Sequence, residues 1–427
     1  MRLVIAVVIL TANCLFAAAP NDIIFGISTA RRPAVYHLGE RIELKLAFST
    51  THPGKYGISY GGTLKGSEDY TVIPTDGVED PYVDPGQLGF VIAGSILSSY
   101  GRLDGGSLPI TADLNERLRF KKPGHYRLHA VSSRISYFHE IGKPSPGNFQ
   151  ISSNEIELTI MPASPDWIAN ELQVINHLFD SPNGQEKMTA ARRLRYLNAK
   201  EAVPQIIRRL PDSLNQPYHY ELYEGLLESS WSDEAITSLD ATLRNPEIPV
   251  GYDTVELLAT VVLTKEYKNK PLPSVKSNRP DQLKTLQAAM EDRQNRFKTL
   301  AIQYTSELSK SVPARRGKPR ADAIFALWKT AELYKPPAPL ASPAELPQLR
   351  QDVVSVANDL SFEQWDWLLS FYWEGLSKAK LLPLIKDLAT APEPIKTGPL
   401  GEDLRKIAAL RWCELDTNCV HNPKSDR

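Results

Sequence analysis

The spacing of apolar residues changes near residue 162, from alternation to a helical period. Before that point, apolar and polar residues alternate along residues 42–48, and again along 126–130 and 156–160. Alternation of this kind is typical of strands with one buried face. After residue 163, apolar residues recur every three or four positions, which predicts helices. The pattern therefore predicts a β module followed by a helical array, a multidomain all-β plus all-α chain.

Turn residues separate the predicted strands of the β module. Gly, Pro and Asp cluster at residues 52–54, 60–62, 84–86 and 104–106. Short strands separated by such turns favour an antiparallel β-sandwich. A Pro-Gly turn also lies two residues before Tyr126. This arrangement resembles the tyrosine corner of immunoglobulin-like sandwiches, in which the hydroxyl bonds back to the backbone. The resemblance implies an Ig-like antiparallel β-sandwich.

The helical array begins after a short stiff linker, residues 161–165, in which Ser164 or Asp166 can cap the first helix. Two short amphipathic helices then follow at residues 191–197 and 201–210, and Pro204 lies in the first turn of the second. This pair resembles a HEAT repeat, which Leu381–Ile385 echoes weakly. The resemblance implies a HEAT-like α-solenoid, whose stacked helix pairs leave a long concave surface.

Two polar stretches interrupt the array, at residues 266–283 and 313–320, with a long amphipathic helix (282–311) between them. The second stretch carries four basic residues among Pro and Gly, which predicts a solvated basic hinge; a contact with an anionic envelope lipid or an acidic peptide is the alternative. The four are Arg315, Arg316, Lys318 and Arg320. We therefore divide the chain into four predicted parts. They are a secretory signal (1–19), the Ig-like β-sandwich (20–162), a first HEAT-like block (163–265) and a second helical block with a C-terminal cysteine loop (266–427).

The N-terminus has the order of a secretory signal: Arg2, the apolar run Leu3–Leu10, then small residues up to Ala19. The run is too short to cross a bilayer, which needs about 20 apolar residues. No later segment is apolar enough to be transmembrane. The pattern predicts an exported bacterial protein, periplasmic or extracellular. Pro20 directly follows the best cleavage site, so an uncleaved N-terminal anchor is an alternative to a cleaved signal. Cys14 makes a lipidated N-terminus a second alternative.

Beyond the predicted signal, the chain contains two cysteines, Cys413 and Cys419. Two cysteines close together in an exported chain predict a local disulfide. Two free thiols near the C-terminus are the alternative.

Charge is balanced, with 49 Lys and Arg residues against 50 Asp and Glu residues. Neither half of the chain has the basic excess that binding to a phosphate backbone needs. We therefore do not expect nucleic acid as a partner.

Candidate metal ligands and catalytic motifs are weak. An acidic run has oxygens that could bind Ca²⁺, but prolines interrupt it and no EF-hand spacing is present, so we interpret it as a solvated loop. The run comprises Asp76, Glu79, Asp80 and Asp84. His125 and His129 lie about 13 Å apart on a strand, too far to share a metal. Ser377–Lys380 and Lys396–Gly398 match S-x-x-K and K-T-G, but their spacing is wrong for penicillin-recognising enzymes. We expect no metal, no cofactor and no enzymatic activity.

The densest aromatic cluster lies on a predicted helix that opens with a capping box, Ser361 and Gln364. Its aromatic residues fall on two helix faces, and both faces cannot point into one core. One set is therefore a candidate binding surface, and packing between helix pairs is the alternative. The candidate binding residues are Trp365, Trp367, Phe371 and Trp373.

Together these features predict an exported, non-catalytic scaffold that holds a protein or peptide partner of the cell envelope on a helical-repeat surface. A glycan- or cell-wall-binding module that uses the Trp365–Trp373 cluster is the first alternative. An envelope hydrolase built from residues distant in sequence is the second.

Overall fold

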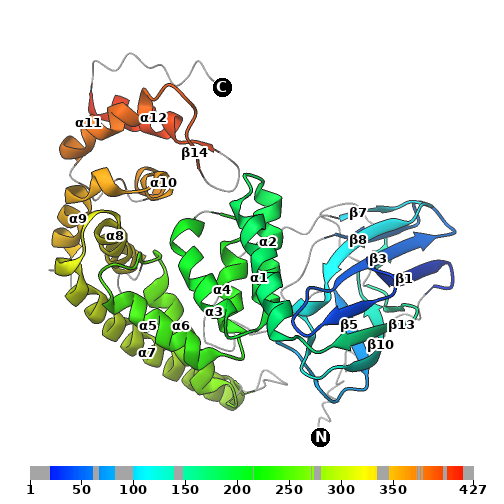
Figure 1. Cartoon of the computed structure of the whole chain (residues 1–427). Coiled ribbons are helices and arrows are strands. Elements are labelled where there is room, and N and C mark those ends of the chain that lie inside the picture. Colours follow the sequence, from blue (N-terminus) through cyan, green and yellow to red (C-terminus); the bar gives the residue numbers. More distant parts are fainter. Residues whose placement is uncertain are drawn as a thin grey trace, which may run out of the picture. The chain divides into compact units, whose positions relative to one another are not determined.

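The computed structural model describes two compact units, a β unit that ends at Ala163 and a helical unit that begins at Ser164 (Figure 1). Each unit has hydrophobic core residues of its own. The described residues are 20–60, 67–81, 100–138, 148–214, 216–270, 272–273, 280–333, 346–371, 373, 376, 378–397 and 402–416. The predicted signal (1–19), with Cys14, lies outside them, as does Cys419.

The β unit consists of short strands in which buried and exposed residues alternate, as the sequence predicts. On β3, for example, Leu44, Leu46 and Phe48 are buried. The strands are β1 (Ile23–Thr29), β2 (Val35–His37), β3 (Glu43–Thr50), β4 (Tyr56–Ser59), β5 (Glu68–Ile73), β6 (Val78–Glu79), β7 (Tyr100–Leu103), β8 (Leu108–Asp113), β9 (Arg119–Phe120), β10 (Gly124–Ser132), β11 (Ile135–Tyr137), β12 (Ile151–Ser152) and β13 (Ile156–Met161).

Antiparallel pairing dominates the sheets of this unit. One sheet has the order β1-β3-β8, and another has the order β11-β4-β7. The largest sheet runs β12-β10-β13-β2, with β5 also paired to β10. Within it β2 pairs with β13 in parallel. The predicted antiparallel β structure of the N-terminal part is thus confirmed.

The predicted bond of the Tyr126 hydroxyl to the backbone is present. Tyr126 lies on β10, and its hydroxyl donates to the carbonyl oxygen of Lys122 at 2.8 Å. The ring packs against Phe120 with 4.8 Å between centroids. A buried tyrosine needs a partner for its hydroxyl, and this turn supplies one.

The acidic run that includes Asp76 and Glu79 is paired with basic residues of the segments on either side of β9. Lys122 Nζ lies 2.8 Å from an Asp76 oxygen, and Lys121 forms an ion pair with Glu79. Asp80 pairs with Arg117 at 3.4 Å. These carboxylates therefore balance nearby cations, and Asp84 lies outside the described residues.

The helical unit contains the expected amphipathic helices. They are α1 (Pro165–Asp180), α2 (Gly184–Leu197), α3 (Ala202–Arg209), α4 (His219–Leu227), α5 (Ser232–Arg244), α6 (Thr254–Tyr267), α7 (Pro280–Ser311), α8 (Gly317–Leu333), α9 (Leu346–Ser355), α10 (Phe362–Phe371), α11 (Lys378–Ala389) and α12 (Leu404–Leu415). The predicted caps form: Ser164 accepts from Trp167 N, and Ser361 and Gln364 bond reciprocally.

Alternate helices of this unit pack on each other. Helices α2, α4, α6 and α8 form one row of neighbours, and α3, α5 and α7 form a second row. Helices α2, α4 and α6 begin at residues 184, 219 and 254, a constant spacing of 35 residues. Figure 1 shows the helices following one another along an arc, with α7 and α9 on its outer side and α8 and α10 on its inner side. The even-numbered helices α2, α4 and α6 therefore repeat at one spacing, whereas α3, α5 and α7 begin at residues 202, 232 and 280 and do not.

Gly225 sets the close approach of α4 to α2. A Cβ atom at this position would lie 3.2 Å from the Arg195 Cα atom and 3.1 Å from Ile206 Cδ1. Gly184, at the start of α2, has nothing within 4 Å of such an atom. The glycine inside α4 is therefore in a tightly packed position, and the one at the start of α2 faces open space.

The predicted solvated hinge at 313–320 is wrong for Arg315 and for residues 317–320, which form the first turn of α8. The Arg315 side chain is fully buried, and a 3₁₀ turn, η4 (Val312–Ala314), leads from α7 towards α8. The guanidinium donates to the carbonyl oxygens of Thr242 and Leu243 at 3.0 Å and of Ile248 at 2.7 Å. Its charge meets the carbonyl end of α5, where helix acceptors lack partners.

Candidate functional site

The four aromatic residues proposed from the sequence divide between core and surface. Trp365 and Trp373 are buried in the core of the C-terminal helices. The Trp373 indole nitrogen donates to a Glu414 carboxylate oxygen at 2.8 Å. Trp367 is half-buried, and Phe371 is 70% exposed. Trp365 and Trp373 thus stabilise the fold, and Trp367 and Phe371 are left as surface candidates.

Trp367 and Phe371 belong to a row of five rings, which we call the ring strip: Tyr220, His219, Tyr252, Trp367 and Phe371. Successive ring centroids lie 6.1, 5.2, 5.8 and 5.4 Å apart. These separations are typical of interacting aromatic pairs. Both ends of the ring strip are open to solvent, since Tyr220 is 73% exposed and Phe371 is 70% exposed.

Three elements distant in sequence supply these rings. The start of α4 supplies His219 and Tyr220, the segment before α6 supplies Tyr252, and α10 supplies the other two. The packing of α4 on α6 brings the first two elements together. The ring strip therefore joins α4, α10 and the segment before α6.

A buried ammonium group lies beneath the middle of the ring strip. Lys329 on α8 places its Nζ atom 4.2 Å from the centroid of Tyr252 and 5.7 Å from that of Trp367. These are cation–π distances. Glu256 Oε1 lies 3.7 Å from the same Nζ atom. Lys329 therefore fixes the inner faces of both rings.

The imidazole of His219 is held from three sides. Ser213 Oγ lies 2.6 Å from Nδ1, and an Asp253 carboxylate oxygen lies 2.8 Å from Nε2. The Tyr252 hydroxyl lies 3.2 Å from Nε2. With both ring nitrogens bonded, His219 cannot rotate without breaking a buried hydrogen bond, and the neighbouring rings keep their orientation.

The pKa values of the two carboxylates behind the ring strip shift in opposite directions. Burial alone would raise the pKa of Asp253, but the attraction of His219 and its hydrogen bond, with Lys329 further away, hold that pKa below its ordinary value. For Glu256, burial raises the pKa against the opposing pull of Lys329. Burial also raises the pKa of Tyr252.

Ser213, His219 and Asp253 share residue types with a hydrolase triad, but their geometry does not suit acyl transfer. All three are buried, and Ser213 is fully inaccessible. The Ser213 hydroxyl also donates to the carbonyl oxygen of Leu210 at 2.8 Å. A nucleophile must reach its substrate, so we assign these three residues a positioning role.

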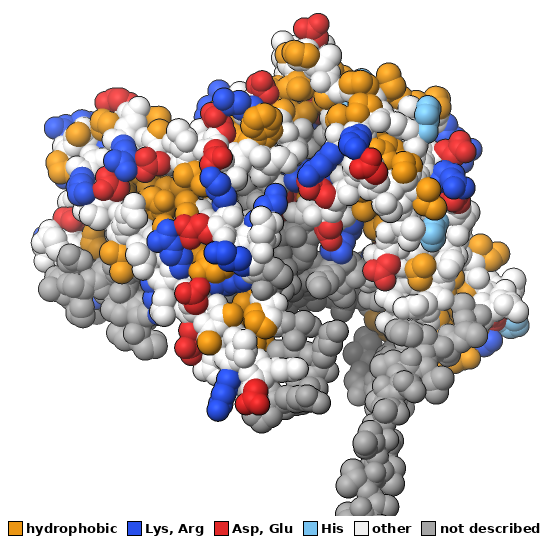
Figure 2. All heavy atoms as spheres, turned by 90° about the horizontal axis from the view of Figure 1, so that it is seen from below, with side chains coloured by type: hydrophobic (Ala, Val, Ile, Leu, Met, Phe, Trp, Pro, Cys, Tyr) orange, Lys and Arg blue, Asp and Glu red, His pale blue; other side chains and the backbone are white. Residues whose placement is uncertain are grey.

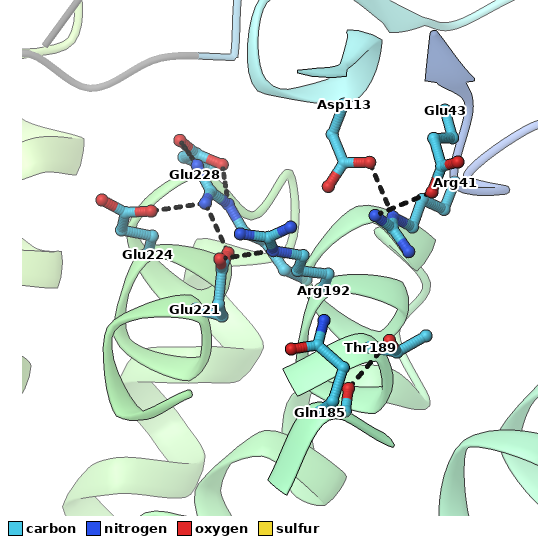
Figure 3. Close-up of polar contacts among 10 residues, drawn as sticks. Arg41, Glu43, Asp113, Gln185, Thr189, Arg192, Glu221, Glu224 and Glu228 are labelled. Carbon is cyan, nitrogen blue, oxygen red and sulfur yellow. Dashed lines mark hydrogen bonds and ion pairs between the residues drawn. The ribbon is translucent and has the colours of Figure 1, made fainter. Parts of the chain in front are cut away.

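A second polar cluster joins α2 to α4 (Figure 3). Arg195 is buried and bonds two oxygens of Glu228 and one of Glu221, at 2.8–2.9 Å. Glu224 also pairs with Arg195, and Arg192 donates to Glu221 at 2.9 Å. Burial alone would raise the pKa of Glu221, but the two arginines hold it below its ordinary value. These charges satisfy one another, which is the pattern of a structural network.

The surface shows no area of a single charge sign on the face drawn in Figure 2, where acidic and basic side chains are interspersed. Within the described ranges, no group of three or more His, Cys, Asp or Glu residues could hold a metal ion. None of the helices in those ranges is long and apolar enough to cross a membrane. Cys413 on α12 is disulfide-bonded. Its pairing with Cys419 stays a prediction.

Sequence reasoning missed most of the ring strip. His219, Tyr220 and Tyr252 have no local pattern that marks them as a site, and Lys329 lies inside a helix of mainly apolar residues. The 35-residue spacing of the helix starts would not have marked the ring strip either, because the position before α4 that is equivalent to Tyr252 before α6 is Pro217.

Comparisons with known proteins leave the family open. No family model matches the chain, and no curated protein is similar to it. Among solved structures, native alpha-2-macroglobulin from Escherichia coli, from domain MG7 to the C-terminus, is 13% identical, with 96% of this chain and 61% of that chain covered and a TM-score of 0.19. Salmonella alpha-2-macroglobulin reacted with methylamine is 9% identical, with 94% and 26% covered and a TM-score of 0.18.

Trypsin-activated alpha-2-macroglobulin from Escherichia coli is 12% identical, with 83% of this chain and 27% of that chain covered and a TM-score of 0.19. The chain spans less than two thirds of the length of each of these proteins. TM-scores at this level carry no argument about fold or function.

Proposed function

We propose that this chain is an exported, non-catalytic binding protein that holds a protein or peptide partner on its helical unit. The single observation that carries the proposal is the ring strip. Its two end rings, Tyr220 and Phe371, are more than two thirds exposed although both are large and mainly apolar. Aromatic residues of this kind dominate the binding energy of protein interfaces.

The architecture supports this proposal. Alternate helices stack in two rows, as a HEAT-like α-solenoid would have them, and α2, α4 and α6 begin 35 residues apart. The rings lie on or beside the even-numbered row, and α8 and α10 are on the inner side of the arc in Figure 1. In such arrays the inner row lines the surface that partners use.

We also propose that the β unit is an Ig-like sandwich. The bond from the Tyr126 hydroxyl to Lys122 O supports this, because a tyrosine corner is a hallmark of that fold. The predominance of antiparallel pairing among its short strands supports it as well.

A protein or peptide suits the ring strip better than a glycan does. Sugars need hydrogen-bonding groups beside the stacking rings. The polar groups behind the ring strip are buried: His219 is bonded on both ring nitrogens, and Lys329 and Glu256 face each other. The polar groups of His219, Lys329 and Glu256 are therefore engaged with one another or with neighbours rather than available to a sugar.

Affinity capture from envelope extract tests the proposed function. The full chain and its Phe371→Ala variant serve as baits, and mass spectrometry identifies the bound proteins. Since a central aromatic contact is often worth 2 kcal/mol or more, we expect Phe371→Ala to weaken capture of a specific partner by roughly thirtyfold. A control variant, Phe362→Ala, removes a ring that is 52% exposed on the same helix.

Phe362 and Phe371 lie nine positions apart, hence on opposite faces of α10. A partner that Phe371→Ala releases and Phe362→Ala retains supports the proposal. If both variants capture the same proteins as the unaltered chain, the ring strip is not the binding surface.

A further inference from the structure

The buried pair of His219 and Asp253 connects two of the segments that carry the ring strip. His219 directly precedes Tyr220 in the chain, and Asp253 directly follows Tyr252. An Asp253 carboxylate oxygen lies 2.8 Å from His219 Nε2. The pair therefore ties the start of α4, with its exposed ring, to the segment before α6.

The proton between the two side chains belongs to Nε2 of His219. Asp253 is the N-cap residue of α6, and the positive end of a helix favours an ionised carboxylate. Burial opposes ionisation, yet the charge of His219 and its hydrogen bond hold the pKa of Asp253 below its ordinary value. An ionised carboxylate can only accept hydrogen bonds, so Nε2 donates.

The other ring nitrogen of His219 faces the hydroxyl group of Ser213. Ser213 Oγ lies 2.6 Å from Nδ1 and 2.8 Å from the carbonyl oxygen of Leu210. A hydroxyl group has one proton, and a carbonyl oxygen cannot donate. When Ser213 donates to Leu210, Oγ accepts from Nδ1, and His219 is an imidazolium. When His219 is neutral, Ser213 has to donate to Nδ1 instead, and its bond to Leu210 is lost.

An imidazolium at His219 also balances the buried charges. Among the described residues, no other basic side chain lies within ion-pair distance of Asp253. The second buried carboxylate, Glu256, has Lys329 at 3.7 Å. Each of these two carboxylates therefore has a cation only when His219 is charged. A buried carboxylate without a counter-charge is strongly destabilising, which favours the charged form of His219.

The remaining titratable groups that face His219 are neutral or already paired. Burial raises the pKa of Tyr252, so its hydroxyl, 3.2 Å from Nε2, keeps its proton. Tyr220 contributes a ring at 6.1 Å between centroids. Glu221, two residues further along α4, is paired with an arginine of α2 at 2.8 Å. The ammonium of Lys329, on α8, lies over the ring of Tyr252.

We propose that Ser213, His219 and Asp253 form a pH-sensitive switch, in which an imidazolium at pH 7 holds the start of α4 in place and keeps the ring strip ordered. When the pH rises, the Nδ1 proton passes to solvent, and Ser213 gives up its bond to Leu210. The ion pair with Asp253 becomes a hydrogen bond from a neutral ring, which is weaker. The regulation of binding by this switch rests on the proposed function.

Nitrogen NMR of the full chain, labelled at its histidines, tests the protonation state. His219→Gln identifies the signals of His219. We expect both ring nitrogens to be protonated at pH 7. A neutral His219 with one ring proton at pH 7 would overturn the inference.

Matched serine variants test the role of the Ser213 hydroxyl in the same NMR titration. Ser213→Ala removes the acceptor at Nδ1 and should lower the pH at which that proton is lost by roughly one pH unit. Ser306→Ala, at an exposed position of α7, should leave that pH unchanged. Equal titrations of the two variants would count against the switch.

Hydrogen exchange measures the order of the start of α4. The protection of residues 219–224, corrected for the intrinsic effect of pH, should fall roughly tenfold over the pH range in which His219 loses its proton. The protection of α7 should not change over that range, and His219→Gln should abolish the fall at residues 219–224. Unchanged protection of residues 219–224 in the unaltered chain would overturn the inference.

Failure of this inference is distinguishable from failure of the proposed function. If envelope capture depends on Phe371 while His219 is neutral at pH 7, the binding function stands and the switch is wrong. If His219 is an imidazolium and protection follows its proton, but no captured protein depends on Phe371, the switch stands and the proposed function is wrong.

Discussion

Replacing Arg315 with Met should destabilise the helical unit strongly, although the residue lies in a stretch whose sequence is typical of a solvated linker. Its guanidinium donates to three backbone carbonyl oxygens, of Thr242, Leu243 and Ile248, and its Nε bonds Ser311 Oγ at 3.0 Å. The substitution leaves these acceptors without a donor inside the protein. It keeps most of the apolar stem, so the loss is mainly polar.

The magnitude follows from the contacts. Three hydrogen bonds to a charged donor, at about 1.5 kcal/mol each, would together contribute about 4.5 kcal/mol. Burial of the guanidinium lowers the pKa of Arg315, which shows that its desolvation offsets part of this gain. We therefore expect the free energy of unfolding to fall by about 3 kcal/mol.

Tryptophan fluorescence during urea unfolding measures this change selectively, because all seven tryptophans lie between Trp167 and Trp412, in the helical unit. With a slope of about 3 kcal/mol per M, the midpoint should move down by about 1 M. Arg316→Met is the matched control, since Arg316 is exposed, and should shift the free energy by less than about 0.5 kcal/mol. Equal midpoints for the two variants would refute the role given to Arg315.

Three further predictions follow from single contacts. Tyr126→Phe removes the hydrogen bond from the hydroxyl to Lys122 O and should lower the free energy of unfolding of the β unit by about 1–2 kcal/mol, measured by circular-dichroism melting. Tyr60→Phe is the control, because Tyr60 forms no such bond. Equal melting curves for the two variants would count against the tyrosine corner. Gly225→Ala should lower the free energy of unfolding by about 1–3 kcal/mol, because the added Cβ atom would press against α2. Gly184→Ala, at an open position, should leave that free energy unchanged. An unchanged free energy for Gly225→Ala would show that α2 and α4 can move apart to accept a methyl group. The pKa of Asp253 is lower in the folded protein than in the unfolded chain. Its ionised carboxylate therefore stabilises the fold at a pH above its ordinary pKa of about 4, and this stabilisation is lost as the pH falls towards the pKa of the folded state. Asp253→Asn should flatten the acid limb of the stability–pH curve, and an unchanged limb would contradict this.

Local features of the fold could be predicted from the sequence because their partners lie a few residues away. The Ser361–Gln364 box and the Ser164 cap form as their spacing predicts. The Tyr126 bond spans four residues and also forms. Each of these depends on backbone geometry that the sequence itself specifies.

Long-range polar contacts could not be predicted in this way. Arg315 bonds carbonyl oxygens 67 to 73 residues before it, and any residue supplies a carbonyl oxygen, so no side-chain pattern marks the acceptors. The ring strip has the same difficulty, since Tyr252 and Trp367 meet only because separate helices pack together. Trp365 and Trp367 look alike in sequence, yet only the former is fully buried.

Site-specific photocrosslinking tests the central claim most directly, that the ring strip binds a partner protein. Phe371→p-benzoylphenylalanine and Phe362→p-benzoylphenylalanine are made in the full chain and irradiated in envelope extract. We predict a discrete adduct with one protein from position 371 and none from position 362. No adduct from position 371, or the same adducts from both positions, would contradict the account.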